Sequence, residues 1–173
     1  MIIVRSPLRI TLGGGGTDQA SYYSDYGGFV IAAAIDKYVY TSVNHSFRNK
    51  ITLKYSKIED VNVPEEVEHP VIREALKLLK IPGCVDIDVI SDIPAGTGLG
   101  SSGSFTTALL QALHLFKREA VTKQDLAEEA YHVEHDLLKQ PVGKQDQYIA
   151  AVGGVTRLSF WNSGMGTHEP LQM

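Results

Sequence analysis

The chain has almost no cysteine. Cys84 is the only one among 173 residues, so neither a disulfide framework nor a thiolate metal cluster can form within one chain. Long apolar runs are lacking as well: no stretch approaches the roughly eighteen residues of a membrane span, and Met1–Arg9 is too short and lacks a signal-peptide pattern. These absences predict a cytoplasmic protein that contacts no membrane.

An excess of positive charge is also missing. Sixteen Lys and Arg stand against twenty Asp and Glu, which gives a net charge of −4 at pH 7. The longest local basic cluster, residues 77–80, belongs to a short predicted amphipathic helix. The sequence therefore argues against a nucleic-acid partner, while a hydrophobic content of 43% is ordinary for one globular domain.

Glycine, by contrast, is concentrated in one loop. Residues 94–104 read Pro-Ala-Gly-Thr-Gly-Leu-Gly-Ser-Ser-Gly-Ser. Residues 84–90, before it, alternate like a half-buried strand, and residues 104–117, after it, predict a mostly apolar helix. Glycines at 96, 98 and 100 permit positive φ, so that amide groups can turn inward, and the helix start adds partial positive charge. The pattern predicts an anion site, with a plain strand-to-helix turn and a serine N-cap as the alternative.

Two common phosphate motifs do not fit this loop. It lacks the Gly-Lys-Ser/Thr ending of a P-loop. About twenty residues further on, where a dinucleotide fold would carry an acidic ribose partner, stand Val121 and Thr122. The loop is therefore a third kind of phosphate loop.

Three segments together resemble the GHMP kinases, small-molecule kinases that include galactokinase, homoserine kinase, mevalonate kinase and phosphomevalonate kinase. Residues 94–102, with the pattern Pro-x-x-x-Gly-Leu-Gly-Ser-Ser, are similar to the family's ATP loop. Residues 7–18, Pro-Leu-Arg-Ile-Thr-Leu-Gly-Gly-Gly-Gly-Thr-Asp, resemble the substrate segment of the sugar-phosphorylating members. Residues 141–148, Pro-Val-Gly-Lys-Gln-Asp-Gln-Tyr, followed by a glycine pair at 153–154, resemble the segment with the catalytic aspartate. The three occur in the family's order.

The resemblance implies a kinase that uses ATP and Mg²⁺, with an assigned site. The ATP-binding residues would be Pro94, Gly96, Gly98, Leu99, Gly100, Ser101, Ser102, Gly103 and Ser104. The acceptor sugar would be bound by Thr11, Gly14, Gly15, Gly16, Thr17 and Asp18. The Mg²⁺ ligands would be Ser102 and Glu134, oxygen donors of the kind that this cation prefers.

The residues themselves suggest how phosphoryl transfer would work. Asp146 is the candidate base, because a positioned carboxylate can take the proton of an attacking hydroxyl. Arg9 would stabilise that carboxylate or the charge that develops on the transferred phosphoryl group. Asp18 suits a sugar, because one carboxylate accepts hydrogen bonds from two adjacent hydroxyls.

Each of these assignments has a structural alternative. Asp146 fits a plain carboxylate at a helix N-terminus, and Arg9 fits a surface arginine on an edge strand. Asp18, together with Thr17, fits the cap of a short helix over residues 19–24. Glu134 fits the solvated face of a charged helix. The histidines at 132 and 135, on either side of it, lack zinc-site spacing and are interpreted as ordinary helix residues.

Within the family, these sequence motifs are similar to those of bacterial heptose kinases. These enzymes phosphorylate the anomeric hydroxyl of D-glycero-D-manno-heptose 7-phosphate in nucleotide-sugar synthesis for surface polysaccharide. Gly15 and Gly16 stand where galactokinase-like members carry Glu-His, and the lost bulk suits a substrate larger than a hexose. Galactose and fucose are the alternative sugars.

The predicted elements favour an α+β fold. Strands or β-rich segments are expected at 2–6, 29–35, 38–44, 50–55, 84–90 and 155–160, and helices near 19–26 and at 70–79, 104–117, 122–138 and 143–151. Residues 56–69, rich in Asp, Glu and Pro, predict a flexible loop. The resemblance implies a mostly antiparallel sheet with helices on one side and a left-handed βαβ unit.

The resemblance covers the N-terminal, ATP-binding domain of the family, assigned to residues 1–173, and includes no C-terminal GHMP domain. The sequence therefore predicts one portion of a kinase, completed by a second chain or by a homodimer. A non-catalytic nucleotide-binding fragment is the alternative. An RNA-binding domain is a third interpretation, which the acidic balance disfavours.

Overall fold

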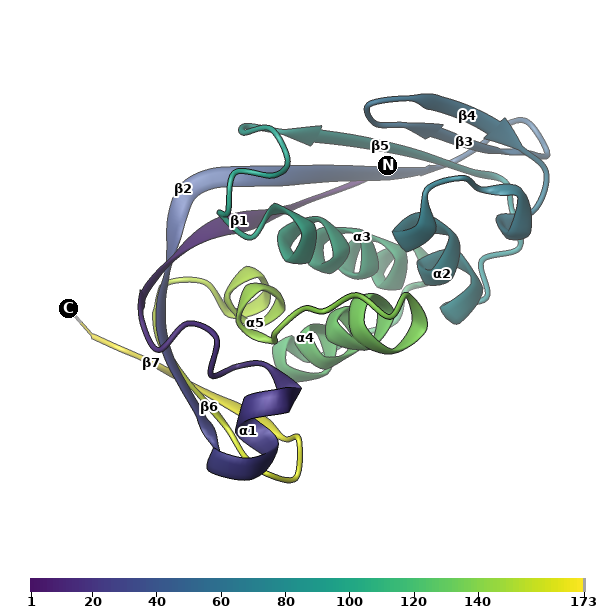
Figure 1. Cartoon of the computed structure of the whole chain (residues 1–173). Helices are drawn as coiled ribbons and strands as arrows, with labels where there is room; N and C mark the ends of the chain where they lie inside the picture. The colour runs from purple at the N-terminus through teal and green to yellow at the C-terminus, as the bar shows by residue number, and fades with distance from the viewer. Residues whose placement is uncertain (173) are drawn as a thin grey trace.

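The strands form one sheet, and all the larger helices lie against one face of it (Figure 1). The computed structural model describes residues 1–172. The strands are β1 (Ile2–Gly13), β2 (Gly28–His45), β3 (Ile51–Lys54), β4 (Ile58–Val61), β5 (Val85–Ser91), β6 (Val155–Phe160) and β7 (Gly166–Pro170). The helices are α1 (Ala20–Tyr26), α2 (Pro70–Leu78), α3 (Ser101–Lys117), α4 (Lys123–Tyr131) and α5 (Gln145–Val152), with a 3-10 turn η1 (Pro64–Glu66) and a π-helix η2 (His132–Leu137). The predicted α+β fold, with its sheet and helices, is confirmed.

The 18-residue strand β2 is the centre of the sheet. Strand β1 runs antiparallel along one side of it. On its other side, β5 pairs with residues 39–45 and β6 pairs with residues 28–33. The sheet therefore divides into two halves that share β1 and β2, and it bends where one half gives way to the other (Figure 1). Residues 29–35 and 38–44 are β-structure as predicted, but they belong to one continuous strand.

Pairing is antiparallel except between β3 and β5, among the residues that the structure describes. Helix α2 lies in the connection between these two parallel strands. Parallel neighbours require such a crossover. The left hand of this crossover stays a prediction.

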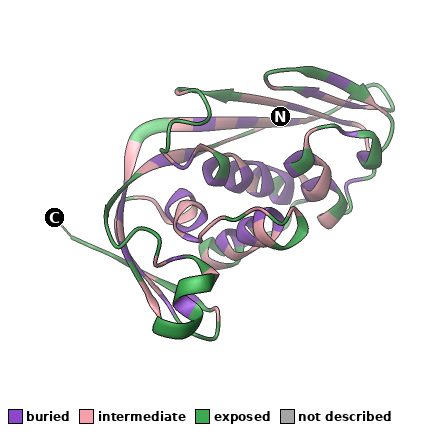
Figure 2. Cartoon of the chain, in the orientation of Figure 1, coloured by how far each residue is buried: buried purple, intermediate pink, exposed green. Residues whose placement is uncertain are grey.

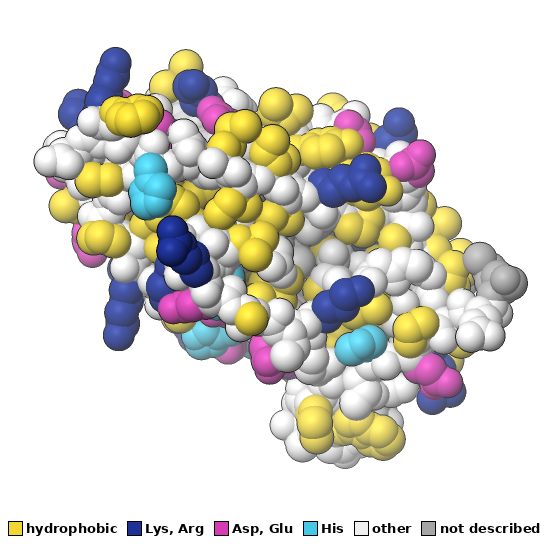
Figure 3. Space-filling view, turned by 180° about the vertical axis from the view of Figure 1, so that it is seen from behind, with side chains coloured by type: hydrophobic (Ala, Val, Ile, Leu, Met, Phe, Trp, Pro, Cys, Tyr) yellow, Lys and Arg dark blue, Asp and Glu magenta, His cyan; other side chains and the backbone are white. Residues whose placement is uncertain are grey.

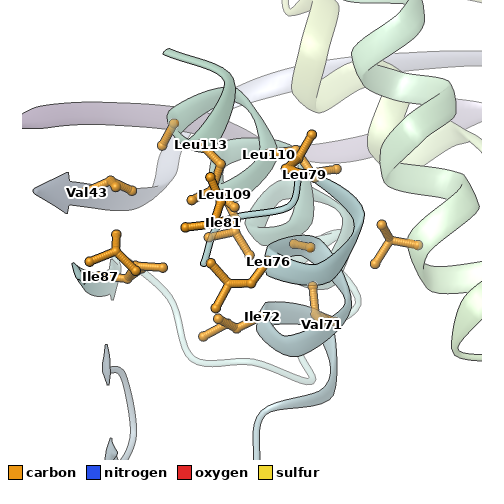
Figure 4. Close-up of a cluster of buried hydrophobic side chains, with 14 of the residues drawn as sticks. Val43, Val71, Ile72, Leu76, Leu79, Ile81, Ile87, Leu109, Leu110 and Leu113 are labelled. Atoms are coloured by element: carbon orange, nitrogen blue, oxygen red, sulfur yellow. The ribbon is translucent and has the colours of Figure 1, made fainter. Parts of the chain in front are cut away.

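The main core lies between the sheet and helices α2 and α3. Figure 4 shows Val43 of β2 and Ile87 of β5 facing the leucines of those two helices, and these side chains are fully buried. Helix α3 is apolar on most sides because it lies between the sheet and the other helices, as the buried residues in Figure 2 show. A second cluster, which includes Tyr148 and Phe160, joins α5 to β2 and β6. The loop at residues 94–100 thus leads directly into α3, the most deeply buried helix.

Residues 56–69 contradict the prediction of a flexible loop, because they contain β4 and η1. Glu59 is buried within β4, and its carboxylate accepts hydrogen bonds from the Tyr55 hydroxyl at 2.7 Å and from the Glu68 amide at 2.6 Å. The flexible loop is predicted from the Asp, Glu and Pro content of the segment. This carboxylate instead organises the turn through backbone bonds, which composition does not reveal.

Two other strands differ from the sequence prediction. Strand β1 continues to Gly13, where residues 2–6 were expected, because β2 offers it a partner along its whole length. Strand β7 was not predicted. Its polar sequence Gly-Thr-His-Glu-Pro carries no apolar alternation, and it forms by antiparallel pairing with β6.

The helices follow the prediction more closely. Thr122 caps α4, and its hydroxyl accepts the Asp125 amide at 3.1 Å. The helix expected over residues 122–138 changes to π geometry at His132.

Within residues 1–172, no helix is long and apolar enough to cross a membrane. On the face shown in Figure 3, Lys and Arg side chains lie in small separate groups among hydrophobic ones.

Candidate active site

The phosphate loop has the backbone geometry that its glycines predict. Gly96, Gly98 and Gly100 have φ values of +83°, +75° and +76°, in the left-handed region that favours glycine. Helix α3 begins at Ser101, directly after the last of them and three residues earlier than expected. The loop therefore ends on the amide groups of a 17-residue helix, which attract an anion.

Arg9 joins this loop to the rest of the site. A register shift in the β1–β2 ladder lies between Pro7 and Arg9, and the Arg9 amide bonds outside that ladder, to the Leu99 carbonyl at 3.0 Å. Its Nη1 donates to the Gly98 carbonyl at 2.6 Å, and its Nε donates to Asp146 Oδ1, also at 2.6 Å. One arginine thus contacts both the phosphate loop and the candidate base, where the alternative was a surface arginine.

Asp146 lies in the first turn of α5 with its side chain 26% exposed. Burial raises the pKa of this carboxyl above its ordinary value, and the nearby Asp18 raises it further, whereas the bond to Arg9 acts in the opposite direction. A carboxylate with a raised pKa is a stronger base than a free one. The arrangement therefore places a carboxyl of raised pKa beside a fixed positive charge.

The segment predicted to bind the sugar lies at the start of the same helix. The Thr11 hydroxyl donates to Gln145 Oε1 at 2.8 Å. Asp18 is only 2% exposed, and its carboxylate accepts the amides of Gly16 and Gln145, each at 3.0 Å. The glycines at 14–16 are exposed between these two contacts. The Asp18 carboxylate thus joins the glycine turn to α5, and its role as a sugar ligand stays a prediction. Gln145 is a residue that sequence reasoning missed.

Several motif residues are occupied with protein contacts. The Thr17 hydroxyl donates to the Gly14 and Phe29 carbonyls at 2.8 and 2.9 Å. The Ser104 hydroxyl is buried and donates to the Pro7 carbonyl at 2.7 Å. Gly103 is packed against Asp146, and a Cβ there would lie 2.6 Å from Asp146 Cβ. These residues hold the loop, β1 and α5 together.

Glu134 is fully buried, which removes the alternative of a solvated helix face. Its Oε1 accepts hydrogen bonds from the Ser102 hydroxyl and, at 2.9 Å, from the Thr106 hydroxyl, and its Oε2 accepts one from Gln147 Nε2. In the described part of the chain, no Lys, Arg or His forms an ion pair with it. A buried carboxylate held only by neutral donors is favourably compensated by a cation. The donor set therefore fits Mg²⁺.

The histidines on either side of Glu134 pair with a different carboxylate. His132 and His135 are half-buried, and each contacts Asp136 at 2.8 Å. Within residues 1–172, no three His, Cys, Asp or Glu side chains gather in a way that would hold a metal ion. A cation at Ser102 and Glu134 would therefore take its remaining ligands from water and from a bound phosphate, as Mg²⁺ commonly does.

A pocket of about 560 Å³ opens beside the phosphate loop. Its lining includes Ser101 and Ser102, the rings of Tyr55, His69 and Phe105, and apolar and small polar side chains of the neighbouring segments. His69 lies between Tyr55 and Phe105 there, with ring centroids 4.9 and 5.2 Å away, and burial lowers its pKa. Sequence reasoning missed all three rings: Tyr55 directly follows β3, His69 ends the segment interpreted as a loop, and Phe105 belongs to α3.

Gly98 offers a sharp test of the loop. A Cβ there would meet no protein atom within 4 Å, so a larger side chain affects only the loop conformation and a bound ligand. We expect Gly98→Leu to weaken ATP binding at least about tenfold, measured by calorimetry; tenfold corresponds to about 1.4 kcal/mol. The control is Gly153→Leu, at the other end of α5, which has φ +77° and equally open space. Equal ATP affinity in the two variants would overturn the phosphate-loop assignment.

The comparisons with known proteins agree with this geometry. The model of the GHMP kinases N terminal domain matches residues 69–154. The chain belongs to the GHMP kinase family. That match includes the phosphate loop, Glu134 and Asp146, and it leaves Arg9 and residues 11–18 outside.

Individual GHMP kinases match a longer stretch. The D-glycero-alpha-D-manno-heptose 7-phosphate kinase of Campylobacter jejuni is 27% identical over 99% of this chain and 54% of its own length. The galactokinase of Thermotoga petrophila is 30% identical over 87% of this chain and 43% of its own length. The crystal structure of a D-glycero-D-manno-heptose 1-phosphate kinase from Bacteriodes thetaiotaomicron has a TM-score of 0.92 and 26% identity, over all of this chain and 60% of that one. The chain spans about half the length of the curated relatives it matches.

Proposed function

We propose that this GHMP kinase transfers the γ-phosphoryl group of ATP to a hydroxyl of a sugar phosphate, with Asp146 as the base. The single observation that carries the proposal is Arg9, whose side chain contacts both the Gly98 carbonyl of the phosphate loop and the Asp146 carboxylate. It brings a site for phosphate and a proton acceptor to the same point of the fold.

The residues divide the chemistry in the following way. The sugar hydroxyl oxygen forms a bond to the γ-phosphorus, the bond from that phosphorus to the oxygen of ADP breaks, and the hydroxyl proton passes to Asp146. Arg9 holds the carboxylate in place and stabilises the negative charge of the transferred group. The raised pKa of Asp146 suits it to this proton.

The nucleotide would lie along α3. Its phosphates would be bound by the loop at 94–102 and the first amides of α3, while Gly103 and Ser104 support the loop from beneath. The base and ribose would occupy the 560 Å³ pocket beside the aromatic rings of Tyr55, His69 and Phe105. Ser102 and Glu134 would hold Mg²⁺, which neutralises phosphate charge when bound.

The acceptor is proposed to be a heptose phosphate, D-glycero-D-manno-heptose 7-phosphate, phosphorylated on the anomeric hydroxyl. Likeness to the Campylobacter jejuni kinase supports it, as do the exposed glycines at 14–16, which leave room for a large sugar. Galactose is the alternative, because a galactokinase is also among the relatives. We place the protein in the cytoplasm, where ATP and such sugar phosphates are made.

A further portion of protein is proposed to complete the site. Ile10 and Leu12, on β1 close to Thr11, are 40% and 59% exposed, and Phe29 on the adjoining strand is 46% exposed. Such apolar side chains beside a site are typical of a surface that another domain or chain covers. A protein that binds nucleotide without transferring phosphate is the second candidate function, favoured by this open side.

The first experiment is calorimetric titration with Mg-ATP, followed by an assay of ADP release on adding heptose 7-phosphate, with galactose as the matched alternative. Binding with turnover is expected for a kinase, and the sugar that gives the higher rate identifies the substrate class. Binding without turnover supports the nucleotide-binding candidate. Absence of ATP binding would contradict both.

A further inference from the structure

We propose that Gln147 is a positioning residue of the cation site, fixing the Glu134 carboxylate from the helix that also carries the base. This inference rests on the proposed function and adds to it a residue that no motif singled out for this role. Gln147 directly follows Asp146 in the first turn of α5.

The first observation is the division of donors around Glu134. Oε1 accepts the hydroxyls of Ser102 and Thr106, both on α3, and Oε2 accepts Gln147 Nε2 from α5. A hydroxyl proton must turn away when its own oxygen becomes a cation ligand. The amide bond to Oε2 needs no such change. Gln147 therefore keeps the carboxylate oriented while Oε1 and the Ser102 oxygen become available.

The second observation is an orphaned polar atom. Gln147 is 1% exposed, and its Oε1 has no hydrogen-bond partner among the described residues. Buried amide oxygens are nearly always paired in folded proteins, and each exception calls for an explanation. A hydrated cation bound at Glu134 would explain the unpaired oxygen, because its water molecules can donate hydrogen bonds to Gln147 Oε1.

The third observation is the rigid mounting of this glutamine. At Gly103, a Cβ would lie 3.1 Å from the Gln147 amide nitrogen, so α3 and α5 are in close backbone contact here. The hydroxyls of Ser102 and Thr106 and the amide of Gln147 are thus held at fixed separation around one carboxylate. Such supporting groups typically change metal affinity by about 10- to 100-fold when they are removed.

The test measures cation binding directly. Mn²⁺ is titrated by electron paramagnetic resonance into the full chain saturated with a non-hydrolysable ATP analogue. We expect Gln147→Met to weaken Mn²⁺ binding by at least about tenfold, with the affinity for the analogue in EDTA unchanged. The matched control is Gln124→Met, which loses bonds to the Tyr148 hydroxyl and the Gly166 carbonyl in a different network. Equal Mn²⁺ affinity in Gln147→Met and the wild type would overturn the proposal.

A second variant tests the proposal in case Gln147→Met does not fold. Gln147→Glu keeps the shape, removes the donor and places a second carboxylate beside Glu134. We expect it to melt at a lower temperature than the wild type in EDTA and to gain more stability from Mn²⁺. The same Mn²⁺-induced shift in both proteins would contradict a role at the cation site. If the wild type itself binds neither the analogue nor Mn²⁺, the proposed function fails instead.

Discussion

Replacing Asp146 with Asn is expected to lower the rate of phosphoryl transfer by about 10²- to 10⁴-fold, the usual contribution of a general base, with nearly unchanged affinity for Mg-ATP. The amide keeps the shape of the carboxylate and can still contact its neighbours, but it takes no proton. ADP release under saturating substrates measures the rate, and calorimetry measures the affinity. A variant with the full rate would show that Asp146 is not the base.

Asp125→Asn is the matched control, because Asp125 occupies the first turn of α4 as Asp146 occupies that of α5. It should leave the rate unchanged.

The thermal stability of Asp146→Asn tests the environment of this carboxyl independently of the rate. Because burial raises the folded-state pKa of Asp146, its contribution to stability is present below the ordinary carboxyl pKa of about 3.9 and is lost as pH rises through the raised value. The variant should therefore melt above the wild type at neutral pH, and the difference should vanish in acid.

Gly103→Ala is expected to destabilise the fold and to slow transfer, although alanine is the better helix former by about 1 kcal/mol. A Cβ at this position would lie 2.6 Å from Asp146 Cβ and 3.1 Å from the backbone of α5. Overpacking of this kind costs about 1–3 kcal/mol, so the contact outweighs the propensity. We expect a net loss of about 1–2 kcal/mol, which lowers Tm by about 2–8 °C.

The same substitution displaces the base, because α5 must move for the methyl group to fit. A misplacement of about 1 Å lowers a rate by roughly 100-fold, so the loss of kcat should exceed the loss of ATP affinity. Gly13→Ala is the control, since no atom lies within 4 Å of its added Cβ and its φ is not left-handed. An increased Tm in Gly103→Ala would show that the two helices are less closely packed than described.

Much of the site could be predicted because its residues occur in short, contiguous segments of the sequence. The glycines at 96, 98 and 100 adopt positive φ as their positions suggest, and the helix that follows them begins within three residues of the predicted start. Thr122 caps its helix as expected. These are local properties, in which a residue's own backbone freedom or its nearest neighbours decide the result.

Burial was harder to predict, because it depends on residues far away in the chain. A solvated helix face was the alternative for Glu134, yet its carboxylate is fully buried and accepts hydrogen bonds from α3 and α5. Strand β7 has no apolar alternation and exists only through its pairing with β6. The three aromatic rings of the pocket come from three separate segments.

The sequence alone therefore determined the parts of this site: a glycine-rich loop before a helix, an arginine, and an aspartate at another helix start. Only the tertiary structure decided how they meet. Arg9 and Asp146 are 137 residues apart and touch at 2.6 Å, because the bent β1 and α5 both pack beside α3. The reason is physical: backbone conformation follows local sequence, whereas the partner of a buried charge is selected by the packing of the whole sheet and its helices.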